Sequence, residues 1–173
     1  TGSTTLTVIQ PPEGLGDYRS ASSGVWSSAA TWQTNNGTGW VTASVPPNNS
    51  ATAGVVTIRT GHTVTVSAAT TVDQVVVQAG GQITVNNVTF TVANGTGTDL
   101  DVSGNVVLTG TSGAISAGAG AAIAFKGGSV YQHARTTGTI PSATWDTNST
   151  WLITGITRAL PGGLAQTFGH FTW

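Results

Sequence analysis

The chain between Gly81 and Thr109 reads GQITVNNVTFTVANGTGTDLDVSGNVVLT, and its apolar residues come in pairs two positions apart. A polar residue separates the members of most pairs, as Thr84 separates Ile83 from Val85. This alternation is the pattern of a β-strand with one buried face. The Asn, Gly and Ser residues between the pairs favour tight corners. The segment therefore predicts short strands joined by single corners.

The same rhythm extends from Val55 to His133. The apolar pairs are Val64/Val66, Val75/Val77, Ile83/Val85, Phe90/Val92, Leu100/Val102, Val106/Leu108 and Ile123/Phe125. Three such strands with their corners take up roughly 20 to 27 residues, which suits one coil of a solenoid. The alternative is an antiparallel sandwich, but sandwiches favour longer strands, two-residue hairpins and Greek-key loops. We therefore predict an all-β solenoid, with a lead-in and cap over residues 1–54 and coils over residues 55–173, as one structural domain.

The composition narrows the classes of function. Only 11 of the 173 residues are charged (five basic and six acidic) and the net charge is −1, which argues against binding to nucleic acid or to an anionic membrane surface. The absence of Cys excludes a thiol nucleophile, disulfides and Cys-based metal sites. No apolar run approaches the roughly 18 residues of a membrane span, so no membrane insertion is expected. So few Lys and Glu residues favour a secreted or cell-surface protein, whose signal segment has been removed.

Several motifs resemble the β-helix segment of large surface and secreted proteins from polysaccharide-degrading Gram-negative bacteria that use type IX secretion. In chain order they are Tyr18-Arg19-Ser20, Gly24-Val25-Trp26-Ser27-Ser28, Thr31-Trp32, IRTGHTVTV (58–66), TVDQV (71–75), GGQITV (80–85), Tyr131-Gln132-His133, GTIP (138–141), Ala143-Thr144-Trp145, LITG (152–155) and QTFG (166–169). The match runs from Tyr18 over nearly the whole chain, and the order of the motifs makes it fairly specific.

This resemblance implies a right-handed parallel β-helix, export, and membership of a larger protein with flanking domains. It does not fix a function, because such segments accompany diverse enzymes and adhesins. It also supplies no catalytic residues. The chain departs from the family pattern at Trp151, where the family usually has a smaller residue, often Cys.

Aromatic residues are the main candidates for ligand contact. There are six Trp and two Tyr residues, and most lie outside the regular strand pairs. Sugar rings stack their C–H groups on aromatic faces, and their hydroxyls need polar partners. We expect a carbohydrate-binding surface formed by Tyr131, Gln132, His133, Arg135, Trp145 and Trp151, with a second aromatic group at Trp26, Trp32 and Trp40. The alternative is that these Trp residues plug the ends of the solenoid or pad its loops.

Two carboxylates lie close together in sequence, at Asp99 and Asp101. Their spacing predicts that both lie on one strand face, with Leu100 and Val102 turned inward. Such a pair suits a weak calcium site, the acid and base of a glycosidase, or a polysaccharide lyase with Lys126 as its base. The plainer interpretation is two solvated charges that discourage strand-edge aggregation.

The three His residues lack metal-ligand spacing, and there is no phosphate loop or nucleophile elbow. The Thr-rich strands lack the strict repeat that ice binding requires. No cofactor is therefore expected. We expect a non-catalytic carbohydrate-binding module that anchors a secreted polysaccharide-degrading enzyme to a polysaccharide such as a plant cell-wall glycan. The alternative is a structural spacer or adhesin segment of a cell-surface protein that binds no glycan.

Overall fold

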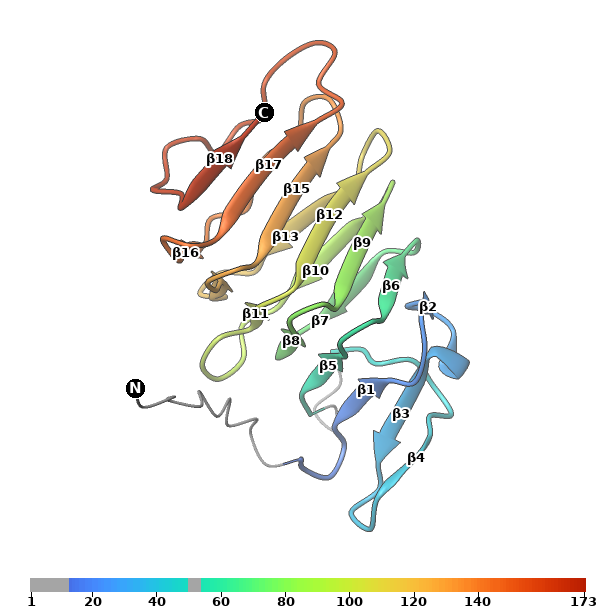
Figure 1. The fold of residues 1–173 in the computed structure, drawn as a ribbon. Helices are drawn as coiled ribbons and strands as arrows, with labels where there is room; N and C mark the ends of the chain where they lie inside the picture. The colour runs from blue at the N-terminus through green and yellow to red at the C-terminus, as the bar shows by residue number, and fades with distance from the viewer. Residues whose placement is uncertain (1–12, 50–53) are drawn as a thin grey trace, which may run out of the picture.

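The chain folds into a β-solenoid of about 5 turns, which confirms the predicted fold class (Figure 1). The computed structural model describes residues 13–49 and 54–173; residues 1–12 and 50–53 of the predicted lead-in and cap lie outside them. The hand of the winding and the N-terminal cap stay predictions. Apart from the 3₁₀ turn η1 (Ala29–Thr31), the regular structure is β-strand. Over the described ranges, no helix has the length and apolar character needed to cross a membrane.

The strands form three sheets that run along the solenoid. The eight-stranded sheet has the order β16-β14-β11-β8-β5-β1-β3-β4, and the seven-stranded sheet has the order β18-β17-β15-β12-β9-β6-β2. The three-stranded sheet has the order β13-β10-β7. The strands are β1 (Tyr18–Ser20), β2 (Gly24–Val25), β3 (Trp32–Asn35), β4 (Trp40–Thr42), β5 (Val56–Ile58), β6 (Thr63–Val66), β7 (Thr70–Val72), β8 (Val75–Val77), β9 (Gln82–Asn86), β10 (Thr89–Val92), β11 (Leu100–Val102), β12 (Asn105–Thr109), β13 (Ala114–Ala117), β14 (Ile123–Phe125), β15 (Val130–Ala134), β16 (Thr144–Trp145), β17 (Thr150–Thr154) and β18 (His170–Thr172).

Successive coils pair in parallel. Val56 pairs with Val75, and Val75 pairs with Leu100, so one coil takes 19 residues and the next takes 25. These lengths lie close to the coil length predicted from the corner spacing. The exception is the N-terminal hairpin, where β3 pairs antiparallel with both β1 and β4. This hairpin extends the eight-stranded sheet beyond the first coil (Figure 1).

The predicted apolar pairs point into the solenoid and stack from coil to coil. One interior column contains Val64, Ile83, Val106, Tyr131 and Trp151, which pair in register and are all buried. Side chains therefore become larger along this column toward the C-terminal coils. This column is filled by Val and Ile near the start and by aromatic rings near the end.

Aromatic rings also fill the interior near the N-terminal coil. Trp26 lies 4.8 Å from Trp32 and 5.1 Å from Phe90, measured between ring centroids. The Trp26 indole donates to the carbonyl of Pro47 at 3.0 Å, and the Trp32 indole donates to the carbonyl of Trp26 at 2.8 Å. Both indoles are buried with their polar groups satisfied, so two members of the second aromatic group belong to the core.

The corner between β11 and β12 shows how closely the coils approach. The backbone N–H of Gly104 donates to the carbonyl of Val77 on the preceding coil at 3.1 Å. A Cβ at Gly104 would collide with the carbonyl oxygens of Gln78 and Gly81. Only glycine leaves room for this backbone contact.

Candidate functional site

Tyr131 and His133, the centre of the predicted carbohydrate surface, lie inside the solenoid. Both are on β15, point inward and have no exposed surface. The Tyr131 ring packs edge-on against Phe125 at 5.6 Å and against Trp145 at 5.8 Å. Burial raises the pKa of the Tyr131 hydroxyl. In this arrangement neither side chain offers a face to a glycan.

The His133 ring is held by hydrogen bonds to its own loop and strand. Its Nε2 lies 2.7 Å from the carbonyl oxygen of Thr137, which accepts only, so Nε2 carries the proton. Its Nδ1 lies 3.4 Å from the Tyr131 hydroxyl. Burial lowers the pKa of His133 and the charge of Arg135 lowers it further, while the bond to Thr137 raises it. The ring is therefore a neutral core group.

The two predicted Trp residues belong to an aromatic stack at the C-terminal end. Trp145 lies parallel to Phe125 at 4.3 Å, with an interplanar angle of 6°, and Phe168 packs on it at 4.9 Å. Trp151 is only 6% exposed and is covered by Phe168 at 4.5 Å and Phe171 at 4.7 Å. These rings pack on one another, which leaves little aromatic surface for a sugar.

The polar members of the predicted set are half-buried and bonded to neighbouring coils. Gln132 donates to the Thr154 hydroxyl at 3.0 Å. Arg135 donates to the backbone carbonyls of Thr111 and Gly113, which ties its loop to the coil before. The six predicted residues are thus adjacent in the fold but divided between the core and the outer surface, and they do not form one shared contact surface.

The two carboxylates also separate. Asp101 lies on the outer surface, 3.6 Å from the Lys126 ammonium. Asp99 is fully buried at the corner before β11, where it accepts hydrogen bonds from the N–H groups of Gly95 and Ala122 at 2.7 Å each. Asp99 is therefore not exposed beside Asp101 and the two carboxylates form no shared outer pair, although Leu100 and Val102 do point inward as predicted. Among the residues with a described position, no three His, Asp or Glu side chains gather as a metal site would require.

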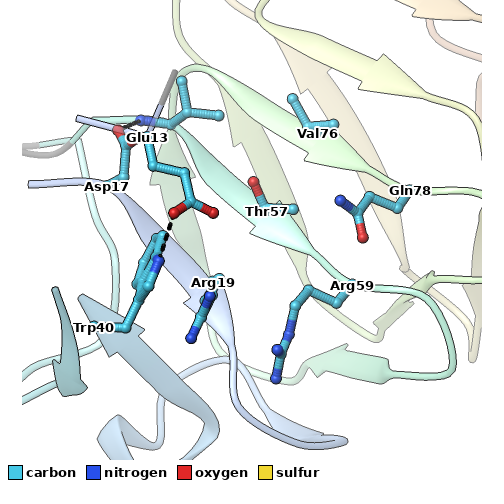
Figure 2. A pocket seen from close by; sticks show the side chains of 9 residues that line it. Glu13, Asp17, Arg19, Trp40, Thr57, Arg59, Val76 and Gln78 are labelled. Atoms are coloured by element: carbon cyan, nitrogen blue, oxygen red, sulfur yellow. Dashed lines mark hydrogen bonds between the residues drawn. The ribbon is translucent and has the colours of Figure 1, made fainter. Parts of the chain in front are cut away.

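A groove of about 210 Å³ lies on the outer side of the eight-stranded sheet (Figure 2). Arg19, Thr57 and Val76 pair in register across β1, β5 and β8 and point outward, because the residues on either side of Thr57 and of Val76 are buried. The groove is lined by Glu13, Asp17, Arg19, Trp40, Val55, Thr57, Arg59, Val76 and Gln78. In Figure 2, Glu13 and Trp40 lie on one side, Gln78 and Arg59 lie on the other, and Thr57 lies between them.

Hydrogen bonds hold the side chains of the groove in place. The Trp40 indole donates to Glu13 Oε2 at 2.8 Å, and the guanidinium of Arg19 lies 4.2 Å from the centre of the Trp40 ring. Arg19 Nε also donates to Gln33 Oε1 at 2.9 Å. The β3–β4 hairpin therefore supplies both the ring under Arg19 and one of its hydrogen-bond acceptors. Such an arrangement is organised before any ligand arrives.

On the other side of the groove, the backbone of the first coil fixes Arg59. Its Nε donates to the carbonyl of Ser20 at 2.7 Å, and its Nη2 lies 3.4 Å from the carbonyl of Ala21. Burial lowers the pKa of Arg19, the positive charge of Arg59 lowers it further, and Glu13 raises it. The two guanidinium groups are thus close enough to repel one another.

The sequence placed Trp40 in the second aromatic group and did not associate it with Arg19 or Arg59. The available signal was charge: four of the 11 charged residues, namely Glu13, Asp17, Arg19 and Arg59, line this one groove. They come together because β1 stacks on β5 and the hairpin folds beside them.

No protein-family model matches the chain, and neither the curated proteins nor the solved structures contain a significant match to it.

We expect Trp151→Ala to lower the free energy of unfolding by about 3–5 kcal/mol, because it removes a buried ring that packs against Phe168 and Phe171. Trp151→Phe is expected to cost less, since the buried indole N–H has no hydrogen-bond partner among the described residues. Urea denaturation measures both variants. Trp173→Ala is the control, because Trp173 is 69% exposed and its loss is expected to change stability by less than about 0.5 kcal/mol. Equal stability of Trp151→Ala and the parent protein would contradict the core position.

Stability is expected to fall as the pH drops below about 6.5. The unfolded chain takes up a proton on His133 there, while burial keeps the folded ring neutral to a lower pH. The contribution of one such group is at most about 1.4 kcal/mol per pH unit. In His133→Gln this contribution is absent. The slope of unfolding free energy against pH, measured between about pH 4.5 and 6.5, is therefore expected to become shallower. An unchanged slope in the variant would show that His133 titrates alike in both states.

Proposed function

We propose that the chain is a non-catalytic carbohydrate-binding module, and that the groove beside Trp40 is where it contacts the glycan. The module anchors a larger secreted or cell-surface protein to a polysaccharide and so raises the local concentration of substrate around its neighbouring domains. The proposal keeps the class of function expected from the sequence but moves the contact from the C-terminal aromatic residues to the first coil.

The observation that carries the proposal is the gathering of charged side chains around a Trp ring in this groove. Only about 6% of the chain is charged, yet two acids, two arginines and a half-exposed Trp line one small cavity. Carboxylates accept hydrogen bonds from sugar hydroxyls, guanidinium groups donate to them, and Thr57 and Gln78 do both. Trp40, Val55 and Val76 supply apolar surface for the C–H faces of a sugar ring.

The size of the groove suits one unit of a polymer. Its volume of about 210 Å³ is below the roughly 300–1,000 Å³ of typical small-molecule sites. A single sugar ring enters, and the rest of the polymer lies on the outer surface of the solenoid. Few contacts of this kind give weak, reversible binding, which suits a module that must release and rebind its glycan.

A non-catalytic role fits the way the carboxylates are used. Asp99 is saturated by backbone N–H groups, and Asp101 pairs with Lys126. In the groove, Asp17 Oδ1 accepts from Val55 N–H at 2.8 Å and Asp17 Oδ2 accepts from Gly14 N–H at 2.6 Å. Asp17 and Asp99 hold backbone in place and Asp101 is paired with Lys126, so the acid and base pair of a glycosidase is not favoured.

Export by type IX secretion and attachment to flanking domains are part of the same proposal. They rest on the resemblance of the motifs between Tyr18 and Gly169 to β-helix segments of such proteins. A solenoid without Cys is compatible with this location, because its stacked core needs no disulfide.

The second candidate function is a structural spacer that binds no glycan. It is favoured by a specific observation, which is that Trp26, Trp32, Tyr131 and Trp151 are buried in the core. An aromatic interior stiffens the solenoid and leaves few aromatic rings on its surface. The two candidates differ in whether the Trp40 groove retains a polysaccharide.

Affinity electrophoresis of the chain through gels containing plant and algal polysaccharides separates them. We expect one class of glycan to slow the parent protein and Trp40→Ala to abolish the effect, because that change removes the ring and the support of Arg19. Trp173→Ala, at the other end of the solenoid, is expected to migrate like the parent protein (Figure 1). Absence of retardation with every polysaccharide would favour the spacer and contradict the proposal.

A further inference from the structure

We propose that the groove recognises an acidic glycan and that Arg19 and Arg59 hold the carboxylate of a uronic acid unit. This inference rests on the proposed function and names the class of its ligand. It follows from the hydrogen bonds and ion pairs of the two arginines and the two carboxylates that line the groove.

Neither arginine forms a salt bridge within the described residues, although the charge of Glu13 acts on Arg19. Arg19 donates from Nε to Gln33, and its two Nη groups form no hydrogen bond within the described part of the chain. Arg59 uses Nε and Nη2 toward backbone carbonyls, which leaves Nη1. Two positive charges therefore line one groove, and each guanidinium keeps N–H groups that can donate to a ligand.

The carboxylates of the groove are engaged by groups other than the two guanidiniums. Asp17 binds the N–H groups of Gly14 and Val55, and Glu13 accepts from the Trp40 indole. Glu13 lies across the groove from Arg59 (Figure 2). Its charge repels an anion from that side, so a ligand with one carboxylate has one favoured orientation, with the carboxylate toward the arginines.

The repulsion between the arginines makes an anion the fitting occupant. The two positive charges line the same groove, so their proximity carries an electrostatic cost. A carboxylate between them relieves that cost and accepts charge-assisted hydrogen bonds from both. The planar fork of a guanidinium matches the two oxygens of a carboxylate, and both side chains are already held in position.

General attraction to polyanions does not explain such binding. The net charge of the chain is −1, so any retention by an acidic polymer has to come from a local site. Arg158, by contrast, lies exposed near the C-terminal end and provides a matched charge outside the groove.

The test compares four polymers in affinity electrophoresis: polygalacturonate, the same polymer with its carboxyl groups reduced to alcohols, a sulfated carrageenan, and a neutral galactan. We expect retardation by polygalacturonate that carboxyl reduction abolishes and that added salt weakens. Retardation by carrageenan with none by polygalacturonate would indicate that the groove binds a sulfate group and not a carboxylate, and would overturn the inference.

Variants connect the effect to the two arginines. Arg19→Gln is expected to weaken binding to polygalacturonate by about 10-fold or more, since it removes a charge-assisted contact. Arg19→Lys, which keeps the charge without the fork, is expected to fall between Arg19→Gln and the parent protein. Arg158→Gln is expected to bind like the parent protein. Urea denaturation of each variant separates lost binding from lost folding.

The outcomes also distinguish this inference from the proposed function. Binding to the neutral galactan that Trp40→Ala abolishes and Arg19→Gln leaves unchanged would keep the carbohydrate-binding module and overturn the acidic ligand. Equal weakening by Arg19→Gln and Arg158→Gln would indicate diffuse charge attraction and also overturn it. No binding to any of the four polymers would overturn both.

Discussion

Parallel hydrogen bonding between successive coils places each inward residue directly on its counterpart in the next coil. Because adjacent strands lie about 4.8 Å apart, the interior side chains have to stack at that spacing. Val columns meet this requirement through β-branched shapes, and the C-terminal columns meet it through flat rings, as Phe125 and Trp145 do at 4.3 Å. The same spacing leaves no room for a Cβ at Gly104, where two backbones approach. Close packing between coils therefore limits which residues fit at the corners and in the core of each coil.

The groove exists because the N-terminal hairpin departs from this parallel stacking. After β1, the chain leaves the first coil and returns as β3 and β4, antiparallel to the sheet. The hairpin carries Trp40 and Gln33 to the outer side of β1, where both contact Arg19. The following coil contributes Thr57 and Arg59, and the next contributes Val76 and Gln78. Residues far apart in sequence therefore meet at one place, and four of the 11 charged residues of the chain are gathered there.

The alternation of apolar residues was enough to predict strands, coil length and inward positions such as Leu100 and Val102. The same alternation, continued in register from Val106 and Leu108, would have placed Tyr131 and His133 inside. They were instead interpreted as surface residues because of their side-chain chemistry. The burial of Asp99 was not predicted because Asp99 lies at a corner, where the backbone N–H groups of Gly95 and Ala122 bind its carboxylate. The groove was beyond sequence reasoning, since nothing local brings Trp40 to Arg19 and Arg59.

The most direct test of the account is an NMR titration that follows the six indole N–H signals of the ¹⁵N-labelled chain as polygalacturonate fragments are added. Each Trp reports its own surroundings, and the indole of Trp40 lies in the groove, bonded to Glu13. The account predicts that the Trp40 signal shifts in proportion to ligand while the signals of Trp26, Trp32 and Trp151 stay in place. Shifts of Trp145 and Trp151 with an unchanged Trp40 signal would contradict it and return the binding surface to the C-terminal coils.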